Sequence, residues 1–231
     1  PGQARADVHD QVLATTIRLS RETEDSDAWR SYTRAFIAEF AARGGDEYEA
    51  TVRDFASSEN PDIAWRARRA LAARGLVDAD AIEAWRSADG SGEAARMSVE
   101  ALASLPLEDA RSRAWESVYS ESLSNDFLTA TLAGLNASSW EGDSGLDSAV
   151  DRLRPYWEAH TIGMALRYAN GVLAYGLDID REGSVERSVG LLRGWLDAHG
   201  DAPAQLRRIV LEHLDAFERD ERVQRRWGSG Q

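Results

Sequence analysis

Four histidines are the first candidates for chemistry: His9, His160, His199 and His213. Histidine is the common zinc ligand and the side chain that exchanges protons near neutral pH. A His-Glu-x-x-His motif would place two imidazoles on one helical face with a carboxylate between them. The sequence holds no such motif, since Glu158 stands two residues before His160 and Glu212 is adjacent to His213. Because such close positions diverge around a helix, we predict no metal ligands in this chain.

Serine and glycine motifs lead to the same conclusion. Residues 142–145, Gly-Asp-Ser-Gly, resemble the nucleophile loop of serine proteases, but the strand pattern of their β-barrels is missing, and no Gly-x-Ser-x-Gly elbow occurs. We interpret 142–145 as a turn and a helix N-cap. Residues 90–93, Gly-Ser-Gly-Glu, lack the Lys and the preceding strand of a phosphate-binding loop. Carboxylate pairs such as Glu47 and Glu49, or Asp178 and Asp180, are too common in an acidic chain to be informative.

The sequence therefore offers no candidate catalytic, cofactor-binding or metal-ligating residue, and the substrate-binding residues stay unknown. Cysteine is absent, which excludes disulfides, thiol nucleophiles and thiolate metal sites. This absence fits a reducing compartment, and we expect a cytoplasmic protein.

The overall composition is that of a soluble globular protein, with 43% apolar and 29% charged residues among 231. No apolar run approaches the ~20 residues that cross a bilayer, so we expect no membrane partner. The 27 basic residues, all arginine, face 40 acidic ones and leave a formal net charge of −13. Such a surface repels phosphate backbones, and we expect no nucleic-acid partner.

Apolar residues recur at helical spacing along nearly the whole chain. Trp29, Tyr32, Phe36 and Phe40 form one stripe. No stretch shows the sustained alternation that is typical of a half-buried strand. Start and stop signals divide the chain into about eleven short helical segments joined by short turns. We predict an all-α fold of stacked antiparallel helical hairpins, an irregular HEAT-like α-solenoid whose neighbouring hairpins share the core.

Several boundaries can be placed from capping chemistry. Candidate N-caps and first-turn residues are Asn60 with Pro61, Asp78, Ser91, Ser124 or Asn125, Ser184, and Asp201 with Pro203. Candidate stops are Gly44 with Gly45, Gly75, Gly90, the region of Pro106, and Gly200. Pro155 is expected to start or kink a helix. The least regular stretch, 136–145, is predicted to be a loop and a candidate internal boundary within a single domain spanning 1–231.

The tripeptide Ala-Trp-Arg occurs at 28–30, 64–66 and 84–86, with the near-copy Ala-Trp-Glu at 114–116. On a helix, Ala permits close approach of a neighbour, Trp covers the seam, and the charged residue faces solvent. We interpret the motif as a way of packing helices, with Trp65 on the flank of its helix. An aromatic and cationic ligand surface is the alternative.

Five stretches, taken in order, resemble a known family. They are 65–85, 106–125, 132–138, 153–159 and 206–219. In 106–125 the pattern consists of Pro106, Ala110-Arg111, Ala114-Trp115 and Leu123-Ser124-Asn125. The series resembles the C-terminal helical domain of actinobacterial-type aminopeptidase N, in the M1 family of zinc aminopeptidases, and it covers roughly residues 28 to 222.

The resemblance implies a function for the parent protein rather than for this chain alone. The family's zinc site and its Gly-x-Met-Glu-Asn substrate loop lie in an earlier domain, and no residue here matches either. The chain would be the lid that encloses the substrate cavity, and its partners would be the catalytic domain of the same polypeptide and peptide substrates. Since the sequence starts at Pro1 without Met or a leader, we expect a piece of a longer protein. A free-standing HEAT-like scaffold that binds a protein or a peptide is the alternative.

Overall fold

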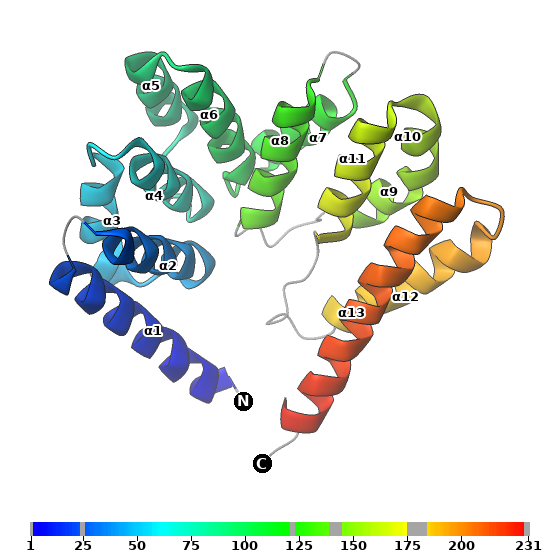
Figure 1. Ribbon diagram of the computed structural model, residues 1–231, viewed down its shortest axis with the longest axis horizontal. Coiled ribbons are helices and arrows are strands. Elements are labelled where there is room, and N and C mark those ends of the chain that lie inside the picture. Colours follow the sequence, from blue (N-terminus) through cyan, green and yellow to red (C-terminus); the bar gives the residue numbers. More distant parts are fainter. Residues whose placement is uncertain (1, 24–25, 121–122, 139–144, 175–183, 229–231) are drawn as a thin grey trace. The chain divides into compact units, whose positions relative to one another are not determined.

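The fold is seen in a computed structural model that describes residues 2–23, 26–120, 123–138, 145–174 and 184–228 (Figure 1). In these ranges the chain forms thirteen α-helices and one short 3-10 helix, and no strand. The N-terminal elements are α1 (Gly2–Glu22), α2 (Asp27–Arg43), η1 (Asp46–Tyr48), α3 (Glu49–Ala56), α4 (Pro61–Ala73), α5 (Ala79–Asp89), α6 (Gly92–Ser104) and α7 (Glu108–Val118). They are followed by α8 (Asn125–Ala137), α9 (Leu146–Asp151), α10 (Leu153–Ala159), α11 (Ile162–Ala174), α12 (Ser184–Ala198) and α13 (Ala204–Gly228).

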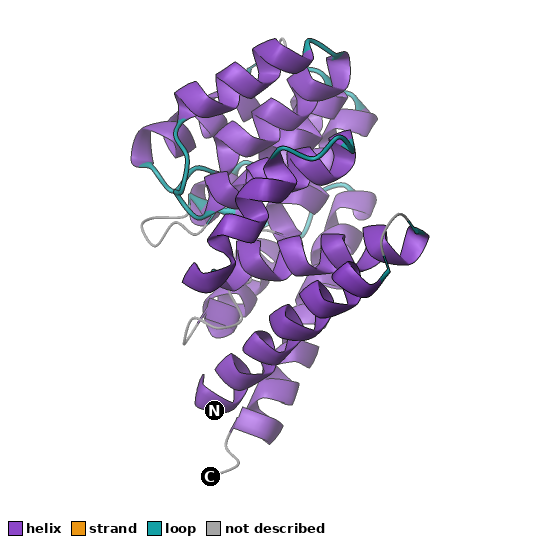
Figure 2. Ribbon diagram, turned by 90° about the vertical axis from the view of Figure 1, so that its left-hand side faces the viewer, coloured by secondary structure: helices purple, strands orange, loops and turns teal. Residues whose placement is uncertain are grey.

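Helices pack mainly against helices that are close to them in sequence. Helix α1 packs on α2, helices α2, α3 and α6 all pack on α4, and α5 packs on α6. Further along, α10 packs on α11, α12 packs on α9 and on α13, and α11 packs on α13. All described regular structure is helical in Figure 2. The prediction of an all-α chain of packed helical hairpins is confirmed.

The chain divides into two compact units. The N-terminal unit comprises Pro1–Ser117 and Ala133–Trp140, and the C-terminal unit comprises Val118–Leu132 and Glu141–Gln231. Helix α8 contributes its first residues to the C-terminal unit and its last residues to the N-terminal unit. Of the stretch predicted as a loop, 136–145, residues 139–144 lie outside the described part of the chain.

Capping chemistry places several of the predicted helix ends. The Asn60 side chain accepts hydrogen bonds from the backbone N–H groups at the start of α4, with Pro61 in the first turn. Asp78 and Ser91 cap α5 and α6 in the same way, through bonds of 2.9 and 3.0 Å. Gly90 ends α5 in the left-handed conformation, with φ of 65°. The side chains of Asn60, Asp78 and Ser91 each accept from a backbone N–H that the helix itself leaves unpaired.

The remaining predicted boundaries also fall close to helix ends. Gly44 follows α2 with φ of 82°, and the Ser124 hydroxyl accepts from the N–H of Phe127 at 3.3 Å at the start of α8. Helix α12 begins at Ser184 and ends two residues before Gly200. Pro155 lies in the first turn of α10, where its missing N–H has no helical partner to lose.

Helix α4 lies at the centre of the N-terminal unit, because it packs on α2, α3 and α6 at once. Its buried residues are Ile63, Ala64, Trp65, Ala67, Ala70, Leu71, Ala72 and Ala73. The prediction that Trp65 lies on the flank of its helix is wrong: the side chain is 1% exposed. With neighbours on several sides, α4 has no single apolar stripe with a solvent-facing flank.

Helix α8 approaches α6 unusually closely at Gly134. A β-carbon at this position would lie 2.2 Å from the Glu100 carbonyl oxygen and 2.7 Å from the Ala103 β-carbon. The Glu100 side chain, almost buried on the same helix, forms an ion pair of 2.6 Å with Arg69 of α4. The backbone contact with α8 and the ion pair with α4 together hold α6 between these two helices.

The C-terminal unit is organised around stacked aromatic rings. Tyr156 of α10 lies between His160 and Tyr168, with ring centroids 3.8 and 3.9 Å away. Arg152 lies 4.2 Å above the ring of Tyr119, whose ring also contacts Tyr168. The Tyr168 hydroxyl donates to the Ala149 carbonyl at 2.8 Å, whereas the buried Tyr156 hydroxyl has no hydrogen-bond partner among the described residues.

This difference between two stacked tyrosines gives a testable prediction. Tyr168→Phe leaves the Ala149 carbonyl without its donor and should cost about 1–2 kcal/mol of unfolding free energy at neutral pH. Tyr156→Phe removes a hydroxyl that has no hydrogen-bond partner in the described part of the chain, and its stability should stay within about 0.5 kcal/mol of the parent. Urea denaturation of both variants measures the difference, and equal losses would contradict the hydrogen-bond assignment.

Tyr156 also predicts how the stability of the fold depends on pH in the alkaline range. Burial raises the pKa of Tyr156 to about 12, and the nearby Tyr119 adds to the shift. An ordinary tyrosine ionises near pH 10, so the unfolded state loses its proton first and wild-type stability falls between pH 10 and pH 12. Tyr156→Phe lacks this loss. Its stability relative to wild type should therefore rise across that interval, and a constant difference would contradict the assignment.

Candidate functional site

His9 lies on α1 and His213 on α13, whereas His160 and His199 follow the ends of α10 and α12. The His9 ring on α1 contacts the Glu39 carboxylate on α2. His160 and His199 each follow a helix, stack on the aromatic ring four residues earlier, and place Nδ1 near that residue's carbonyl oxygen, at 3.1 and 2.9 Å. Burial lowers the pKa of His213, against the opposing effect of Glu212. Within the described ranges, no three His, Asp or Glu side chains gather as a metal site would require.

The serine motif and one carboxylate pair cannot be placed. Residues 142–144 of the Gly-Asp-Ser-Gly stretch lie outside the described residues, as do Asp178 and Asp180. Gly145 precedes α9 in the left-handed conformation, and no side chain of the described residues caps the start of that helix. Gly90 and Ser91 connect α5 to α6, with Ser91 acting as the helix cap and Gly92 as the first residue of α6.

The Ala-Trp-Arg motifs are built into packing contacts in the N-terminal unit. The guanidinium carbon of Arg68 lies 4.9 Å from the ring of Trp65 and 5.3 Å from that of Trp85. Arg68 also donates to the Ala56 carbonyl at 3.0 Å, and the Trp65 indole N–H donates to Asp89 at 3.1 Å. The Trp65 indole N–H and the Arg68 guanidinium group are thus engaged by other groups of the chain. This favours the packing interpretation over a ligand surface.

The contacts within this cluster also shift the pKa values of its charged groups. Hydrogen bonds from Ser91 and from the Trp65 indole lower the pKa of the Asp89 carboxyl. Burial lowers the pKa of Arg68, and the charge of Asp89 opposes this shift. The cluster joins α4 to α5, the two helices that carry the tripeptide copies at 64–66 and 84–86.

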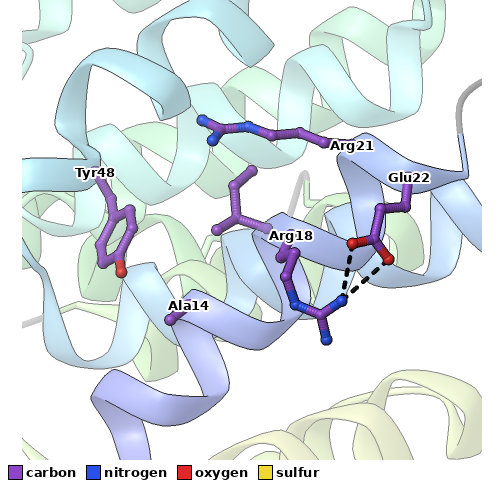
Figure 3. Close-up of a pocket in the computed structure, with 6 residues that line it drawn as sticks. Ala14, Arg18, Arg21, Glu22 and Tyr48 are labelled. Atoms are coloured by element: carbon purple, nitrogen blue, oxygen red, sulfur yellow. Dashed lines mark hydrogen bonds and ion pairs between the residues drawn. The ribbon is translucent and has the colours of Figure 1, made fainter.

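An open hollow lies beside α1 in the N-terminal unit, with a volume of about 440 Å³ (Figure 3). It is lined by Ala14, Ile17, Arg18, Arg21, Glu22 and Tyr48. Arg18 is held by Glu22 through bonds of 2.9 and 3.0 Å, whereas Arg21 has no hydrogen bond or ion pair within the described residues. Figure 3 shows Arg21 extending from α1 in the direction of Tyr48. Chemically, the apolar wall and the unpaired cation suit a small group that carries both an apolar part and a negative charge.

A groove of about 450 Å³ lies between α9 and α12 in the C-terminal unit. Its lining residues are Asp147, Asp151, Arg187, Gly190, Leu191, Gly194, Trp195, Ala198 and His199. Neither hollow was predicted from the sequence. The usable signal was Gly190 and Gly194, two glycines four residues apart inside a helical pattern, where glycine is unfavourable.

No protein-family model and no curated protein matches this sequence. The resemblance to a family therefore rests on the ordered series of residues in the sequence alone.

The structure shows where the residues of that series lie. On α7, Ala110, Arg111 and Ala114 are buried, and Trp115 is partly buried. The stretch 153–159 coincides with α10. None of the described helices is long and apolar enough to span a lipid bilayer. The residues of the series on α7 and α10 therefore belong to helix packing rather than to either hollow.

Proposed function

We propose that this chain is the C-terminal lid of a zinc-dependent M1 aminopeptidase, active in the cytoplasm. The observation that carries the proposal is the position of the resembling residues, which pack the helices of an all-α chain: Ala110, Arg111 and Ala114 are buried on α7. A likeness concentrated at packing positions supports a shared fold. The function then follows from the place of that fold in the parent protein.

The proposed role is to enclose the substrate. Helical hairpins that cover a catalytic domain limit the size of the peptide that enters, and they exclude folded proteins. The zinc, its ligands and the catalytic base would belong to the preceding domain, and no residue of this chain is assigned to them. The partners are that domain, in the same polypeptide, and peptide substrates.

A free-standing scaffold that binds a protein or peptide segment is the second candidate. It is favoured by the two open hollows, because each presents charged side chains at a surface rather than in an enclosed chamber. The coding sequence upstream of Pro1 discriminates between the two. A His-Glu-x-x-His motif followed some twenty residues later by Glu supports the lid, whereas an initiator Met directly before Pro1 contradicts it.

Activity measurements test the lid directly. We expect this chain alone to hydrolyse no aminoacyl-arylamide and to bind no stoichiometric zinc, while the parent protein does both. Deleting the lid from the parent should leave zinc binding intact and change the ratio of kcat/KM between long and short peptides by about tenfold or more. The measurements are turnover on a peptide series of increasing length and metal analysis of each protein. Chelator-sensitive turnover by the lid alone would refute the assignment, and an unchanged length profile would refute the enclosing role.

A further inference from the structure

Helix α8 is divided between the two compact units. Residues 125–132 belong to the C-terminal unit and residues 133–137 to the N-terminal unit, although they form one uninterrupted helix. An α-helix bonds each N–H to the carbonyl four residues earlier, so its backbone bonds continue across this boundary. The two units therefore share one element of secondary structure.

Residues 125–132 of α8 are packed tightly within the C-terminal unit. Leu128 and Leu132 are buried, and α11 comes so close that a β-carbon at Gly171 would lie 2.6 Å from the Leu132 Cδ1 atom. This part of the helix is thus held by the packing of its own unit.

Residues 133–137 are held by the N-terminal unit in the same way. Leu135 is buried, and a β-carbon at Gly134 would lie 2.2 Å from the Glu100 carbonyl oxygen of α6. Glu100 in turn pairs with Arg69 of α4, the helix at the centre of this unit. Each unit thus anchors one part of α8.

Neither part of α8 is long enough to stay helical by itself. The parts contain eight and five of the 13 residues of the helix, whereas isolated helices shorter than about 12–15 residues are marginal in water. When one unit opens, its part of α8 loses the packing that holds it helical. The remaining part then becomes a short, fraying helix end with unpaired backbone groups, and its own unit is weakened.

We propose that α8 couples the stabilities of the two units, so that opening of either unit weakens the other. The coupling acts in both directions, because a coupling free energy between two sites is reciprocal. A partner or ligand that binds one unit consequently stabilises both. The inference does not depend on the proposed lid function, since it uses only α8 and the packing of α8 in this chain.

Amide hydrogen exchange of the whole chain, followed by mass spectrometry, tests this coupling. Trp65→Phe weakens the N-terminal unit and Tyr168→Phe the C-terminal unit, and each should speed exchange of the slowest amides in its own unit about tenfold. Coupling predicts that exchange also rises about threefold or more in the other unit, read on α13 for Trp65→Phe and on α2 for Tyr168→Phe. Trp65→Ala replaces Trp65→Phe if the milder change leaves its own unit unaffected.

Interrupting α8 separates coupling through this helix from any other route. Ala133→Gly places two glycines in succession at the boundary between the units, where the helix becomes easier to break. In this background, Trp65→Phe and Tyr168→Phe should change exchange in the other unit by less than about twofold. Ala84→Gly, the same change at an exposed position inside α5, is the matched control and should leave the full response in place.

Exchange that rises only in the unit that carries the weakening substitution would overturn the proposal, because the two units would then be independent. A response that is as large in the Ala133→Gly background as in the Ala84→Gly background would also overturn it, since the coupling would not pass through α8. The expected result is a response in both units that requires an intact α8.

Discussion

Replacing Gly134 with alanine is expected to destabilise the N-terminal unit by about 3 kcal/mol or more. The new β-carbon would lie 2.2 Å from the Glu100 carbonyl oxygen and 2.7 Å from the Ala103 β-carbon. The first neighbour is backbone in the middle of α6, which cannot rotate away, so α8 and α6 must separate. Separation would also disturb Glu100, whose carboxylate pairs with Arg69.

The control for this prediction is the same substitution where space is free. Gly92 lies at the start of α6, and a β-carbon there would meet nothing within 4 Å. Gly92→Ala should leave stability unchanged or raise it by up to about 0.5 kcal/mol, since alanine is the better helix former. Urea unfolding followed by circular dichroism measures both variants. If Gly134→Ala unfolds at the wild-type midpoint, the close approach of α8 to α6 is wrong.

Trp65→Ala should cost about 3–5 kcal/mol, the range expected when a large buried side chain is removed. Trp65 is 1% exposed and lies among the neighbours of α4, with Arg68 above its ring. Truncation leaves a cavity at the centre of the unit and removes half of the aromatic surface that covers the guanidinium group.

Two further variants divide that cost into its parts. Trp65→Phe retains most of the apolar volume and loses the bond to Asp89, an exposed carboxylate that water can solvate, so the loss should be smaller, about 1–2 kcal/mol. Trp85→Ala, in the next copy of the motif, removes a partly exposed ring and should also cost less than Trp65→Ala. A cost for Trp65→Ala below about 1 kcal/mol would show that the motif serves something other than packing.

Prediction of the fold from sequence succeeded where the signal is local. Residue type and position predict Asn60, Asp78 and Ser91 as N-caps, and in the structure each accepts a hydrogen bond from an N–H two or three residues later. Gly90 was placed as a stop because only a left-handed residue closes that turn without strain. Such contacts lie within a few residues, where sequence spacing determines geometry.

Prediction failed where several helices meet. Helical spacing gives Trp65 a flank position, but it does not reveal that α4 has neighbours on α2, α3 and α6. The groove at Gly190 and Gly194 was missed for a related reason, because its other wall, α9, begins more than forty residues earlier in the sequence. Spacing within one helix carries no information about which distant segment lies opposite.

The pairing of helices with near neighbours in sequence has a consequence for how the chain is made. Helix α1 finds its packing partner as soon as α2 has been synthesised, and α3 finds its partner once α4 follows. Contacts between segments close in sequence need little loop closure, so they form quickly. Apolar surface at these helix pairs can therefore be covered one hairpin at a time as the chain leaves the ribosome, whereas α9 must wait for α12 before that contact forms.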